Sequence, residues 1–471
     1  MDKEPLYVRI AFTLEKQIRS GGWKIGEKLP SLRTICTEYG VSMNTSIQAY
    51  LELERKGMIE SRPKSGFFVS NSCQYRLTIP TISQPSPLAG LLDTEALIKK
   101  VHDSLVDPSM INLSVGIPDE RLLPVAKLNK ELVNAMRSLQ GSGTAYEDTQ
   151  GNLKLRKNIA RWAFAWEGGL TAEDIVSTSG AINALFYCLM ATTKHGDTIA
   201  VESPAYFGIL QLAKSLGLKI MELPTHPITG IEPDALKKVL PKINACVLVS
   251  NFSNPLGSCM PEENKIAVVR MLTEQGIPLI EDDLYGDLYF GTARPKPCKA
   301  FDSEGIVLWC GSMSKTLAPG YRVGWVAPGK FKEQVIQLKL THAISSTSIT
   351  QEVIANFLEN GRYENHLRSM RRTLQGNCLN FIRTIGENFP KNTKVNRPQG
   401  GFTLWLEMDK KKDTSVLYDK ALRHRISIAP GRIFTLQNQF QNCLRLNYGS
   451  IWNESVKQAL EKLGHLVKGM R

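Results

Sequence analysis

GSMSKTLAPGYRVGW, residues 311–325, is the stretch that decides the fold, and it sets one lysine, Lys315, among small and hydroxyl-bearing residues. An uncharged lysine amine can form an imine with an aldehyde, whereas a solvated lysine, with a pKa of about 10.4, is protonated at neutral pH. The glycines and serines around Lys315 would let another molecule approach the backbone closely. The stretch is therefore either a surface turn carrying one charge or the wall of a pocket that holds a reactive amine.

Short apolar runs alternate with helical stretches on both sides of Lys315. The runs cover residues 197–202, 245–251, 277–283, 305–311 and 321–327, and helical stretches such as 184–194 and 263–276 lie between several of them. This alternation is typical of an α/β fold with a mainly parallel sheet covered by helices on both faces. Ligands in such folds bind at the carboxyl ends of the strands, so the residues after each run are the candidates for function.

The residues at these strand ends match the chemical needs of pyridoxal 5'-phosphate (PLP), which is an aldehyde, a phosphate ester and a pyridine. Lys315 supplies an amine for the aldehyde, and Asp282 would keep the pyridine nitrogen protonated, so that the ring can act as an electron sink. Asn254 and Tyr285 would hydrogen-bond the 3'-oxygen, and Tyr206 would stack on the ring.

A phosphate site is expected where STSGAINAL, residues 177–185, opens a helix. The backbone amides of Gly180 and Ala181 would face the phosphate at the helix N-terminus, joined by Ser312 and Arg322. Taken singly, each feature has a structural explanation, because Asn-Pro-x-Gly is usually a turn and acidic residues after strands often cap helices. Their joint occurrence at strand ends, in chain order, favours a cofactor site.

Residues 5–71 have the pattern of three helices followed by a hairpin. The residues that support this prediction are Leu6, Ile10, Leu14 and Ile18 for the first helix, Gly40 for a turn, Ser42 as the cap of the third helix, Ile47, Tyr50 and Leu51 for its buried face, and 63–66 for the hairpin turn. Apolar residues at intervals of three and four predict helices, and serine is a favoured helix cap. A capped helix after a glycine turn is the spacing of a helix-turn-helix, and the hairpin makes it winged.

A winged helix-turn-helix predicts contacts with double-stranded DNA. The first turn of the third helix would face base edges, and basic residues beside it and in the wing would meet phosphates. The candidate DNA contacts are Arg33, Ser42, Asn44, Thr45, Arg62 and Lys64, with Met43 presented on the same turn. The alternative is a three-helix packing unit whose basic residues are solvated.

Composition narrows the compartment and the partners. The net charge of +13 favours polyanionic partners, but residues 1–72 contribute only +3 of it, so local arrangement has to support DNA binding. The nine cysteines show no CxxC pair and no metal-ligand spacing, which indicates reduced thiols and no metal site. No apolar stretch reaches the ~20 residues that cross a bilayer, and the start lacks a signal-like apolar segment, so we expect a cytoplasmic protein without a membrane partner.

Residues 72–92 break all periodicity and contain three prolines. We expect a linker here, and the alternative for its second half is an extended arm bound to the surface of the larger domain. The expected division is a DNA-binding head over residues 1–71, the linker 72–92, and a PLP-binding body over residues 93–471.

The motifs of the body resemble those of a known enzyme family. They are SGA, ESPAYFG, SNFSNPLG, EDDLYGDLYF, GGFTLWL, ISIAPGRIF and LRLNYG, between Ser177 and Gly449, and they resemble fold-type I, class I/II aminotransferases. The first 71 residues, with EKLPSLRTICTEYG and VSMNTSIQAYLELERKGMIESR, resemble the head of GntR regulators. A GntR head joined to an aminotransferase-like body is the MocR-type arrangement. The resemblance implies a smaller C-terminal α+β subdomain in addition to the main sheet.

The resemblance assigns the cofactor roles to the same strand-end residues and adds two more. It implies that Arg445 binds the carboxylate of a substrate or effector, and that Tyr146 reaches the phosphate in the neighbouring subunit. A homodimer is implied, with the heads swapped onto the partner bodies. The head departs from the family pattern at Met43, where similar heads commonly have an arginine, and at Lys64, where they have a glycine.

Two functions follow from this combination. The first is a PLP-dependent, DNA-binding transcriptional regulator that senses a small amine or amino acid through its body. The second is an active aminotransferase that moves an amino group between an amino acid and a 2-oxo acid, with Lys315 as the proton carrier. The regulator is favoured, because an enzyme alone has no use for a capped helix, a turn and a basic wing.

Overall fold

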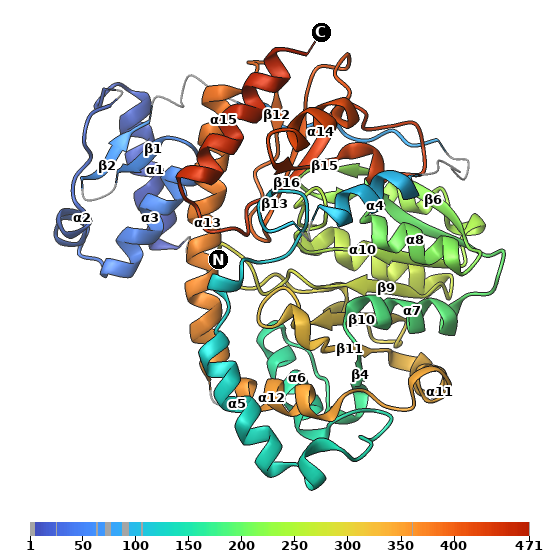
Figure 1. The fold of residues 1–471 in the computed structure, drawn as a ribbon. Coiled ribbons are helices and arrows are strands. Elements are labelled where there is room, and N and C mark those ends of the chain that lie inside the picture. The colour runs from blue at the N-terminus through green and yellow to red at the C-terminus, as the bar shows by residue number, and fades with distance from the viewer. Residues whose placement is uncertain are drawn as a thin grey trace.

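The computed structural model describes residues 5–24, 26–62, 65–70, 77–86, 94–104, 107–359 and 361–470. It consists of a small N-terminal head and a large α/β body, and the head lies beside the long helix α13 (Arg362–Asn388) at one side of the body (Figure 1). The head and the body have separate hydrophobic cores. Within the described ranges no helix is both long and apolar enough to cross a membrane.

The head has the three helices and the hairpin that the sequence predicts. Its elements are α1 (Leu6–Arg19), α2 (Leu32–Tyr39), α3 (Met43–Arg55), and the antiparallel strands β1 (Ile59–Arg62) and β2 (Gly66–Val69). The Ser31 hydroxyl accepts the Thr34 amide at 3.1 Å and starts α2, and Ser42 caps α3 in the same way. Gly40, at φ 61°, ends α2 in a left-handed conformation that glycine adopts without strain.

The buried face of α3 differs from the predicted one by one step around the helix. The inward stripe is formed by Ser46, Ala49, Tyr50 and Leu53. Ile47 and Leu51, expected beside Tyr50, are only partly buried. Tyr50 holds this orientation by donating its hydroxyl to the Pro30 carbonyl at 2.8 Å. In α1 the first residue of the expected apolar stripe, Leu6, is 50% exposed.

The core of the body is an eight-stranded, mainly parallel sheet. In spatial order its strands are β4 (Val176–Thr178), β11 (Gly324–Ala327), β10 (Val307–Ser312), β9 (Leu279–Asp282), β8 (Ala245–Leu248), β5 (Thr198–Ser203), β6 (Lys219–His226) and β7 (Gly230–Ile231). Strands β10, β9, β8, β5 and β6 are parallel, whereas β11 runs antiparallel to β10 and β4, and β7 runs antiparallel to β6. The predicted mainly parallel sheet is confirmed, although β8 ends three residues earlier than the predicted run.

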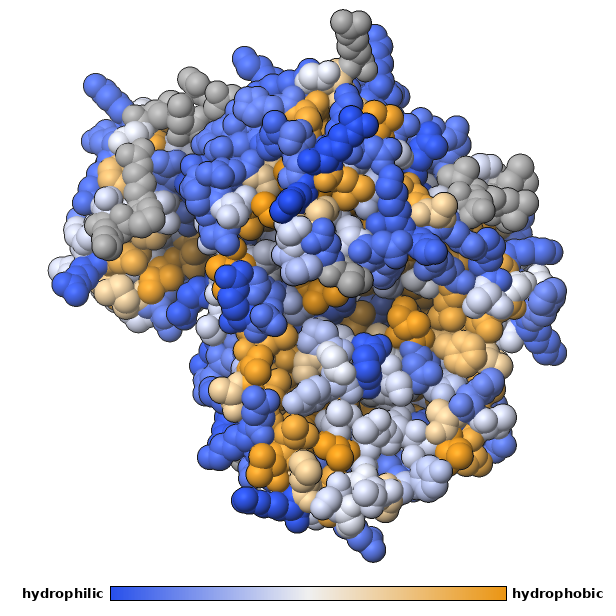
Figure 2. Space-filling view, in the orientation of Figure 1, coloured by the Kyte–Doolittle hydropathy of each residue, from blue (hydrophilic) through white to orange (hydrophobic). Residues whose placement is uncertain are grey.

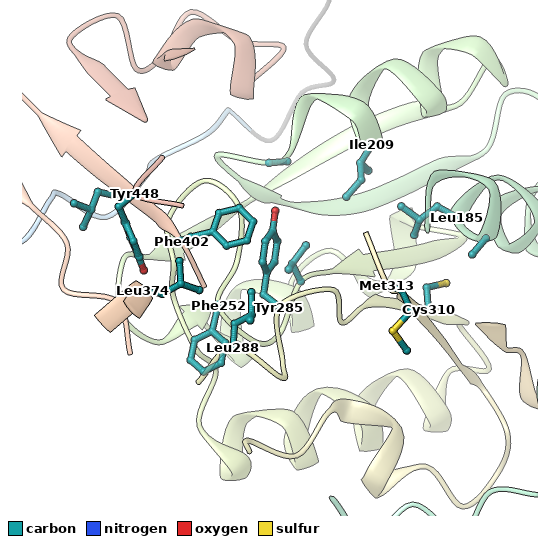
Figure 3. Packing of buried hydrophobic residues seen from close by; sticks show 14 of the residues in the cluster. Leu185, Ile209, Phe252, Tyr285, Leu288, Cys310, Met313, Leu374, Phe402 and Tyr448 are labelled. Carbon is teal, nitrogen blue, oxygen red and sulfur yellow. The ribbon is translucent and has the colours of Figure 1, made fainter. Parts of the chain in front are cut away.

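Helices cover both faces of this sheet, as predicted. The first face carries α7 (Ala181–Thr192) and α8 (Phe207–Ser215), and the second carries α9 (Pro233–Lys237) and α10 (Glu262–Glu274). Leu185 and Ile209 pack from the first face into a core that extends to Tyr285 (Figure 3). Leu236 and Val268 pack from the second face into a separate core. The remaining helices of this part of the body are α5 (Val125–Ser138), α6 (Leu153–Ala163), α11 (Lys332–Ala343) and α12 (Ser348–Glu359).

A smaller α+β subdomain completes the body. Its antiparallel sheet has the order β12 (Lys394–Val395), β13 (Thr403–Glu407), β16 (Cys443–Asn447) and β15 (Ala429–Pro430), and its helices include α4 (Glu95–Asp103), α14 (Thr414–Leu422) and α15 (Glu454–Lys468). The short strand β3 (Ile111–Asn112) pairs in parallel with β14 (Ile426–Ser427). The first residues of the body therefore belong to the same subdomain as its last third.

Residues 77–86, inside the expected linker, form an arm on the body surface. Its Thr81 donates both its amide and its hydroxyl to Glu407, at 2.6 and 2.8 Å. Two body amides donate to the arm: Val395 to the Thr78 carbonyl and Thr225 to the Ser83 hydroxyl, both at 2.9 Å. The Ser86 amide donates to Gln437 at 2.7 Å. Glu407 belongs to the small sheet and Thr225 to the large one. The arm is therefore attached to both parts of the body.

Helix α13 contacts both the lysine turn and the head. It has 27 residues and is about 40 Å long. Near its start the Tyr363 hydroxyl donates to Thr316, the residue after Lys315, at 2.8 Å. Near its end the Arg383 guanidinium lies 3.9 Å from the Glu54 carboxylate of α3. In Figure 1 the head is accordingly placed against the flank of α13.

Candidate cofactor and effector site

A pocket of about 190 Å³ lies at the carboxyl ends of the parallel strands, where the sequence predicts the site. Its walls are formed by Ala181, Ile182, Tyr206, Val249, Asn254, Asp282, Leu284, Tyr285, Ser312, Ser314, Lys315 and Arg322. Most of the strand-end residues singled out in the sequence are thus brought together around one cavity. Gly180 is the N-cap residue of the helix that begins at Ala181. Arg445 is not one of the wall residues, but it donates a hydrogen bond to the wall residue Asn254.

Lys315 stands in the turn after β10, and its amine reaches into the pocket. The Nζ atom donates a hydrogen bond to the carbonyl of Gly116. Burial, and then the nearby Arg445 charge, lower the pKa of the Lys315 amine to about 8, while the Asp282 charge opposes this shift. A much larger fraction of this amine is therefore uncharged near neutral pH than of a solvated lysine, which is what a nucleophilic amine requires.

Asp282 ends β9 and lines the pocket with a carboxylate that is not fully satisfied. Its Oδ1 atom is buried and has no hydrogen-bond partner among the described residues. Burial, and then the charge of Asp283, raise the pKa of the Asp282 carboxyl to about 7, while Lys315 opposes the shift. Buried polar atoms in folded proteins are nearly always paired, so the lone oxygen indicates a donor that arrives with a ligand.

Asn254 and Tyr285 lie together on the wall beside Asp282. The Asn254 side-chain amide donates to the Tyr285 hydroxyl at 3.4 Å, and Tyr285 stands edge-on to Phe402 with ring centroids 5.4 Å apart (Figure 3). Burial raises the pKa of the Tyr285 phenol well above its usual value, so it stays a hydroxyl donor. Tyr206, just before α8, presents its ring to the same cavity. These groups offer two polar atoms and one aromatic face to a planar ligand.

Groups suited to an anion lie together where α7 begins. Gly180, at φ 90°, is packed so tightly that a Cβ atom would come within 2.3 Å of the Arg322 guanidinium. Arg322 donates to the Ser179 carbonyl at 3.1 Å and to the Ser314 hydroxyl at 3.2 Å. The amides of the first turn of a helix lack intrahelical partners, so the arginine, the hydroxyls and the helix N-terminus converge on one site.

Ser314 is a pocket residue that the sequence patterns do not predict. Its hydroxyl accepts from Ser312 at 2.9 Å and lines the pocket beside Arg322. The available signal was its position immediately before Lys315, on the same turn as Ser312.

Arg445 lies in β16 and is fully buried. Its Nη1 donates to the Asn254 side chain at 2.8 Å and its Nη2 donates to the Ser114 carbonyl. Its Nε has no partner among the described residues, and its guanidinium lies 5.0 Å from the Phe434 ring centre. Burial lowers the pKa of Arg445 to about 10, so it remains a cation at neutral pH. A buried cation with a free N–H is suited to receive a carboxylate.

Tyr146 does not join this pocket within one chain. It lies on a loop before α6 and is 83% exposed. No cluster of three or more metal-ligating side chains occurs in the part of the chain that the structure describes.

Three of the candidate DNA contacts, Ser42, Asn44 and Thr45, lie at the start of α3, and Arg33 lies in α2. The Ser42 hydroxyl accepts the Thr45 amide at 3.2 Å and shares a 2.9 Å hydrogen bond with the Thr45 hydroxyl, so both hydroxyls serve the helix cap. Asn44 and Arg33 are exposed. Met43 is 43% exposed on the same turn. The side chain of Arg62 and the whole of Lys64 lie outside the described residues.

Comparison with known proteins places this geometry in a family. The model for aminotransferase class I and II matches residues 108–463, and the model for bacterial regulatory proteins of the gntR family matches residues 6–69. The uncharacterized HTH-type transcriptional regulators YjiR and YdcR of Escherichia coli are 36% and 35% identical over 465 residues, covering 98% of this chain and 98% and 99% of their own lengths.

The chain belongs to the MocR-type GntR regulators. Its body belongs to the aminotransferase class I and II family. The MocR-type body resembles the crystal structure of LysN, the alpha-aminoadipate aminotransferase of Thermus thermophilus, solved in complex with N-(5'-phosphopyridoxyl)-L-leucine. The TM-score is 0.73 at 26% identity, over 78% of this chain and 94% of LysN. The match with regulators over nearly the whole chain favours the regulator over the aminotransferase alternative.

Proposed function

We propose that this protein is a PLP-dependent transcriptional regulator whose head binds double-stranded DNA and whose body senses a small amine or amino acid. One observation carries the cofactor part: the buried Oδ1 of Asp282, a residue of the pocket wall, has no hydrogen-bond partner among the residues that the structure describes. A protonated pyridine nitrogen would supply the missing donor. The phosphopyridoxyl adduct held by the related LysN supports the same cofactor class.

The residues of the pocket fit PLP at each of its functional groups. When bound, PLP supplies an aldehyde that combines with primary amines and a ring that withdraws electrons from them. Lys315 would bond the aldehyde carbon, and Asn254 and Tyr285 would hydrogen-bond the ring oxygen. Tyr206 would cover one face of the ring. The phosphate would be held by Ser312, Ser314, Arg322 and the amides of Gly180 and Ala181.

Arg445 is the proposed effector-binding residue. Its two hydrogen-bonded Nη atoms keep the guanidinium in one orientation beside Asn254, and its Nε has no partner within the described ranges. A carboxylate on the effector would pair with Arg445, and the effector amine would be the group that reacts with the cofactor aldehyde in place of Lys315. The effector class is therefore a small amine or amino acid.

The head would bind DNA through the N-terminal turn of α3. Asn44 would face base edges and Arg33 would meet phosphates, whereas Ser42 and Thr45 position the helix by capping it. Met43 offers only apolar contact where an arginine is common. Arg62 and Lys64 are the proposed wing contacts.

We also propose a homodimer with the heads swapped between subunits. The exposed Tyr146 would complete the phosphate site of the partner. Apolar side chains gather on exposed positions of α5, where Val125, Val133 and Met136 are 46–48% exposed (Figure 2). The proposal keeps the division into residues 1–71, 72–92 and 93–471, and a cytoplasmic location fits a DNA-binding protein.

A footprint tests the regulator. Promoter DNA should be protected at ~100 mM salt, where specific complexes normally persist. PLP together with a cognate amine should change the protection. Lys315→Ala should keep DNA binding and lose the amine response, whereas absence of any protected DNA would refute the proposal.

The alternative is an active aminotransferase, and the complete set of pocket residues around Lys315 supports it. In that case Lys315 would also be the general base that moves a proton between the alpha carbon of the substrate and the aldehyde carbon of the cofactor. Steady turnover of an amino donor with a 2-oxo acid, at ~1 per second or faster as in typical enzymes, would support it. A single slow half-reaction would not.

A further inference from the structure

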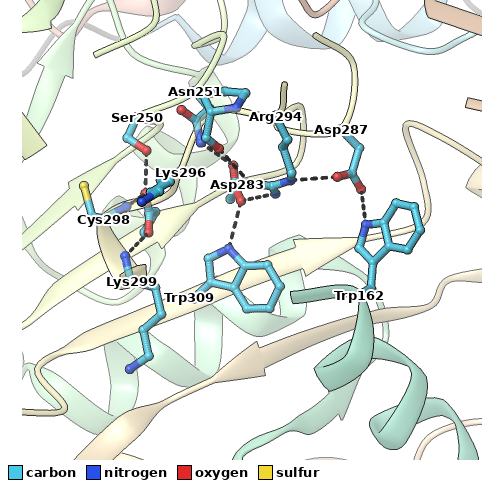
Figure 4. Close-up of polar contacts among 12 residues, drawn as sticks. Trp162, Ser250, Asn251, Asp283, Asp287, Arg294, Lys296, Cys298, Lys299 and Trp309 are labelled. Atoms are coloured by element: carbon cyan, nitrogen blue, oxygen red, sulfur yellow. Dashed lines mark hydrogen bonds and ion pairs between the residues drawn. The ribbon is translucent and has the colours of Figure 1, made fainter. Parts of the chain in front are cut away.

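A buried polar cluster surrounds Asp283, the residue that follows the end of β9 at Asp282 (Figure 4). The side chain of Asp283 is fully buried. Its Oδ1 accepts the Asn251 side-chain amide at 2.9 Å, and its Oδ2 accepts Arg294 at 2.5 Å and the Trp309 indole at 2.9 Å. The cluster is separate from the pocket walls, and the roles proposed above make no use of it.

Arg294 is the only arginine among the described residues that pairs with Asp283, and the fold makes room for it. Its side chain is 7% exposed, and it also donates to Asp287 at 2.7 Å. Gly286 lies under the guanidinium, where a Cβ atom would come within 2.6 Å of Arg294 and 2.5 Å of Asp283. The single guanidinium of Arg294 thus pairs with the carboxylates of both Asp283 and Asp287.

The charge of Asp283 acts on Asp282. After burial it is the largest influence that raises the pKa of Asp282, and Lys315 opposes it. The titratable groups that interact with Asp282 are Glu202, Tyr206, Glu281, Asp283, Tyr285, Cys310 and Lys315. Arg294 is the cation that offsets the nearest of these carboxylates.

We propose that Arg294 is a positioning residue for the cofactor: by offsetting part of the charge of Asp283 it favours the anionic form of Asp282 toward the pocket. This inference rests on the proposed PLP function. Without Arg294, two adjacent buried carboxylates would remain, and one of them would take up a proton. Asp283 would still accept two side-chain hydrogen bonds, from Asn251 and Trp309, whereas Asp282 is bonded by the Leu284 backbone amide and its Oδ1 accepts no hydrogen bond from the described residues. The proton would therefore settle on Asp282, which could no longer attract a protonated ring nitrogen.

The test is the pH dependence of binding of pyridoxamine 5'-phosphate, an amine that cannot bond covalently to Lys315. In the wild type, affinity should fall as the pH drops below about 7, where Asp282 takes up its proton. This fall in affinity is the acid limb of the pH profile. Arg294→Met should shift the acid limb to a pH about one unit or more higher, so that at a given pH on the limb the variant binds about tenfold more weakly. Asp283→Asn should move it down. The double variant D283N/R294M should return it toward the wild type.

The double variant separates charge from structure. It still lacks the Arg294–Asp287 pair, so a structural defect would persist while a charge defect would be rescued. If Arg294→Met does not fold, the downward shift in Asp283→Asn decides. An acid limb that stays at the wild-type pH in Arg294→Met or Asp283→Asn, or a double variant no better than Arg294→Met, would overturn the inference.

A second measurement does not depend on the cofactor. In the cofactor-free protein, the infrared band of the protonated Asp282 carboxyl, assigned by its loss in Asp282→Asn, should titrate near pH 7 and at higher pH in Arg294→Met. Equal midpoints would contradict the role of Arg294 even if the cofactor binds. Absence of any pyridoxamine 5'-phosphate binding would instead refute the proposed function and leave this titration readable.

Discussion

Arg445 donates a hydrogen bond from Nη1 to the Asn254 side-chain oxygen at 2.8 Å, and this bond joins the proposed effector residue to a proposed cofactor residue. The Asn254 amide is thereby turned so that its nitrogen donates toward Tyr285. A ligand that engages Arg445 therefore also meets the group that orients the ring oxygen of the cofactor.

Arg445→Gln should separate the two functions of this pair. Binding of N-(5'-phosphopyridoxyl)-L-leucine should weaken about 30-fold or more, because a buried charge pair worth about 2 kcal/mol is lost. Binding of pyridoxamine 5'-phosphate, which has no carboxylate, should change by less than about threefold. Isothermal titration measures both, with the surface variant Arg270→Gln as the control. Equal losses for the two ligands would show that Arg445 only supports the pocket.

Capture of PLP should depend on pH through Lys315. The pKa of its amine is lowered to about 8, so the neutral, reactive form is present above that pH and falls about tenfold for each unit below it. The rate should therefore rise with pH and level off above about 8, as followed by stopped-flow absorbance. Lys339 is a matched control, because burial lowers the pKa of its amine to about 8 while it bonds Ser177 away from the pocket walls.

The outcome for the two lysines distinguishes them. Lys339→Met should keep the profile, and Lys315→Met should abolish the reaction. A rate that is flat over the same pH range in the wild type would contradict the assignment of Lys315.

Gly180→Ala should damage the proposed phosphate site. The position has φ 90°, and the new methyl group would meet the Arg322 guanidinium at 2.3 Å. We expect a loss of about 2 kcal/mol in the free energy of unfolding and at least tenfold weaker PLP binding. Gly169→Ala is the control, because it has open space around it and no positive φ. Unchanged PLP affinity in Gly180→Ala would place the phosphate elsewhere.

The arm over residues 77–86 should be protected from hydrogen exchange. The Thr81 amide donates to Glu407 at 2.6 Å, so Glu407→Ala should speed exchange of that amide at least tenfold. Asp409→Ala, in the loop after β13, should not. Fast exchange of the arm in the wild type would mean that the whole segment between head and body is free.

The sequence predicts the pocket well because its residues follow a simple rule. Parallel strands end at one edge, so Asn254, Asp282 and Lys315 had to meet once the alternation of strands and helices was recognised. The resemblance to a family added Arg445 and the small subdomain. No local sequence pattern predicts that β3 pairs with β14, because the two strands are some 300 residues apart in the chain.

Other features depend on three-dimensional packing. The buried face of α3 is rotated by one step from the predicted face. Tyr50 donates a hydrogen bond to the Pro30 carbonyl, and the spacing of apolar residues does not predict this contact. The arm looked like a linker because proline-rich, aperiodic sequence is common to both. Arg294 lies 11 residues from Asp283 in a loop, and only the fold shows that the two are paired.

The central claim is that ligand chemistry in the body changes DNA binding by the head. The most direct test is the affinity of PLP-loaded protein for DNA that it has itself selected from random sequence, measured with and without a panel of small amines and amino acids. At least one compound should change the affinity about fivefold or more, as coupling free energies of 1–3 kcal/mol imply, and Lys315→Ala should bind the DNA without responding. Identical affinities for wild type and variant across the whole panel would contradict the account.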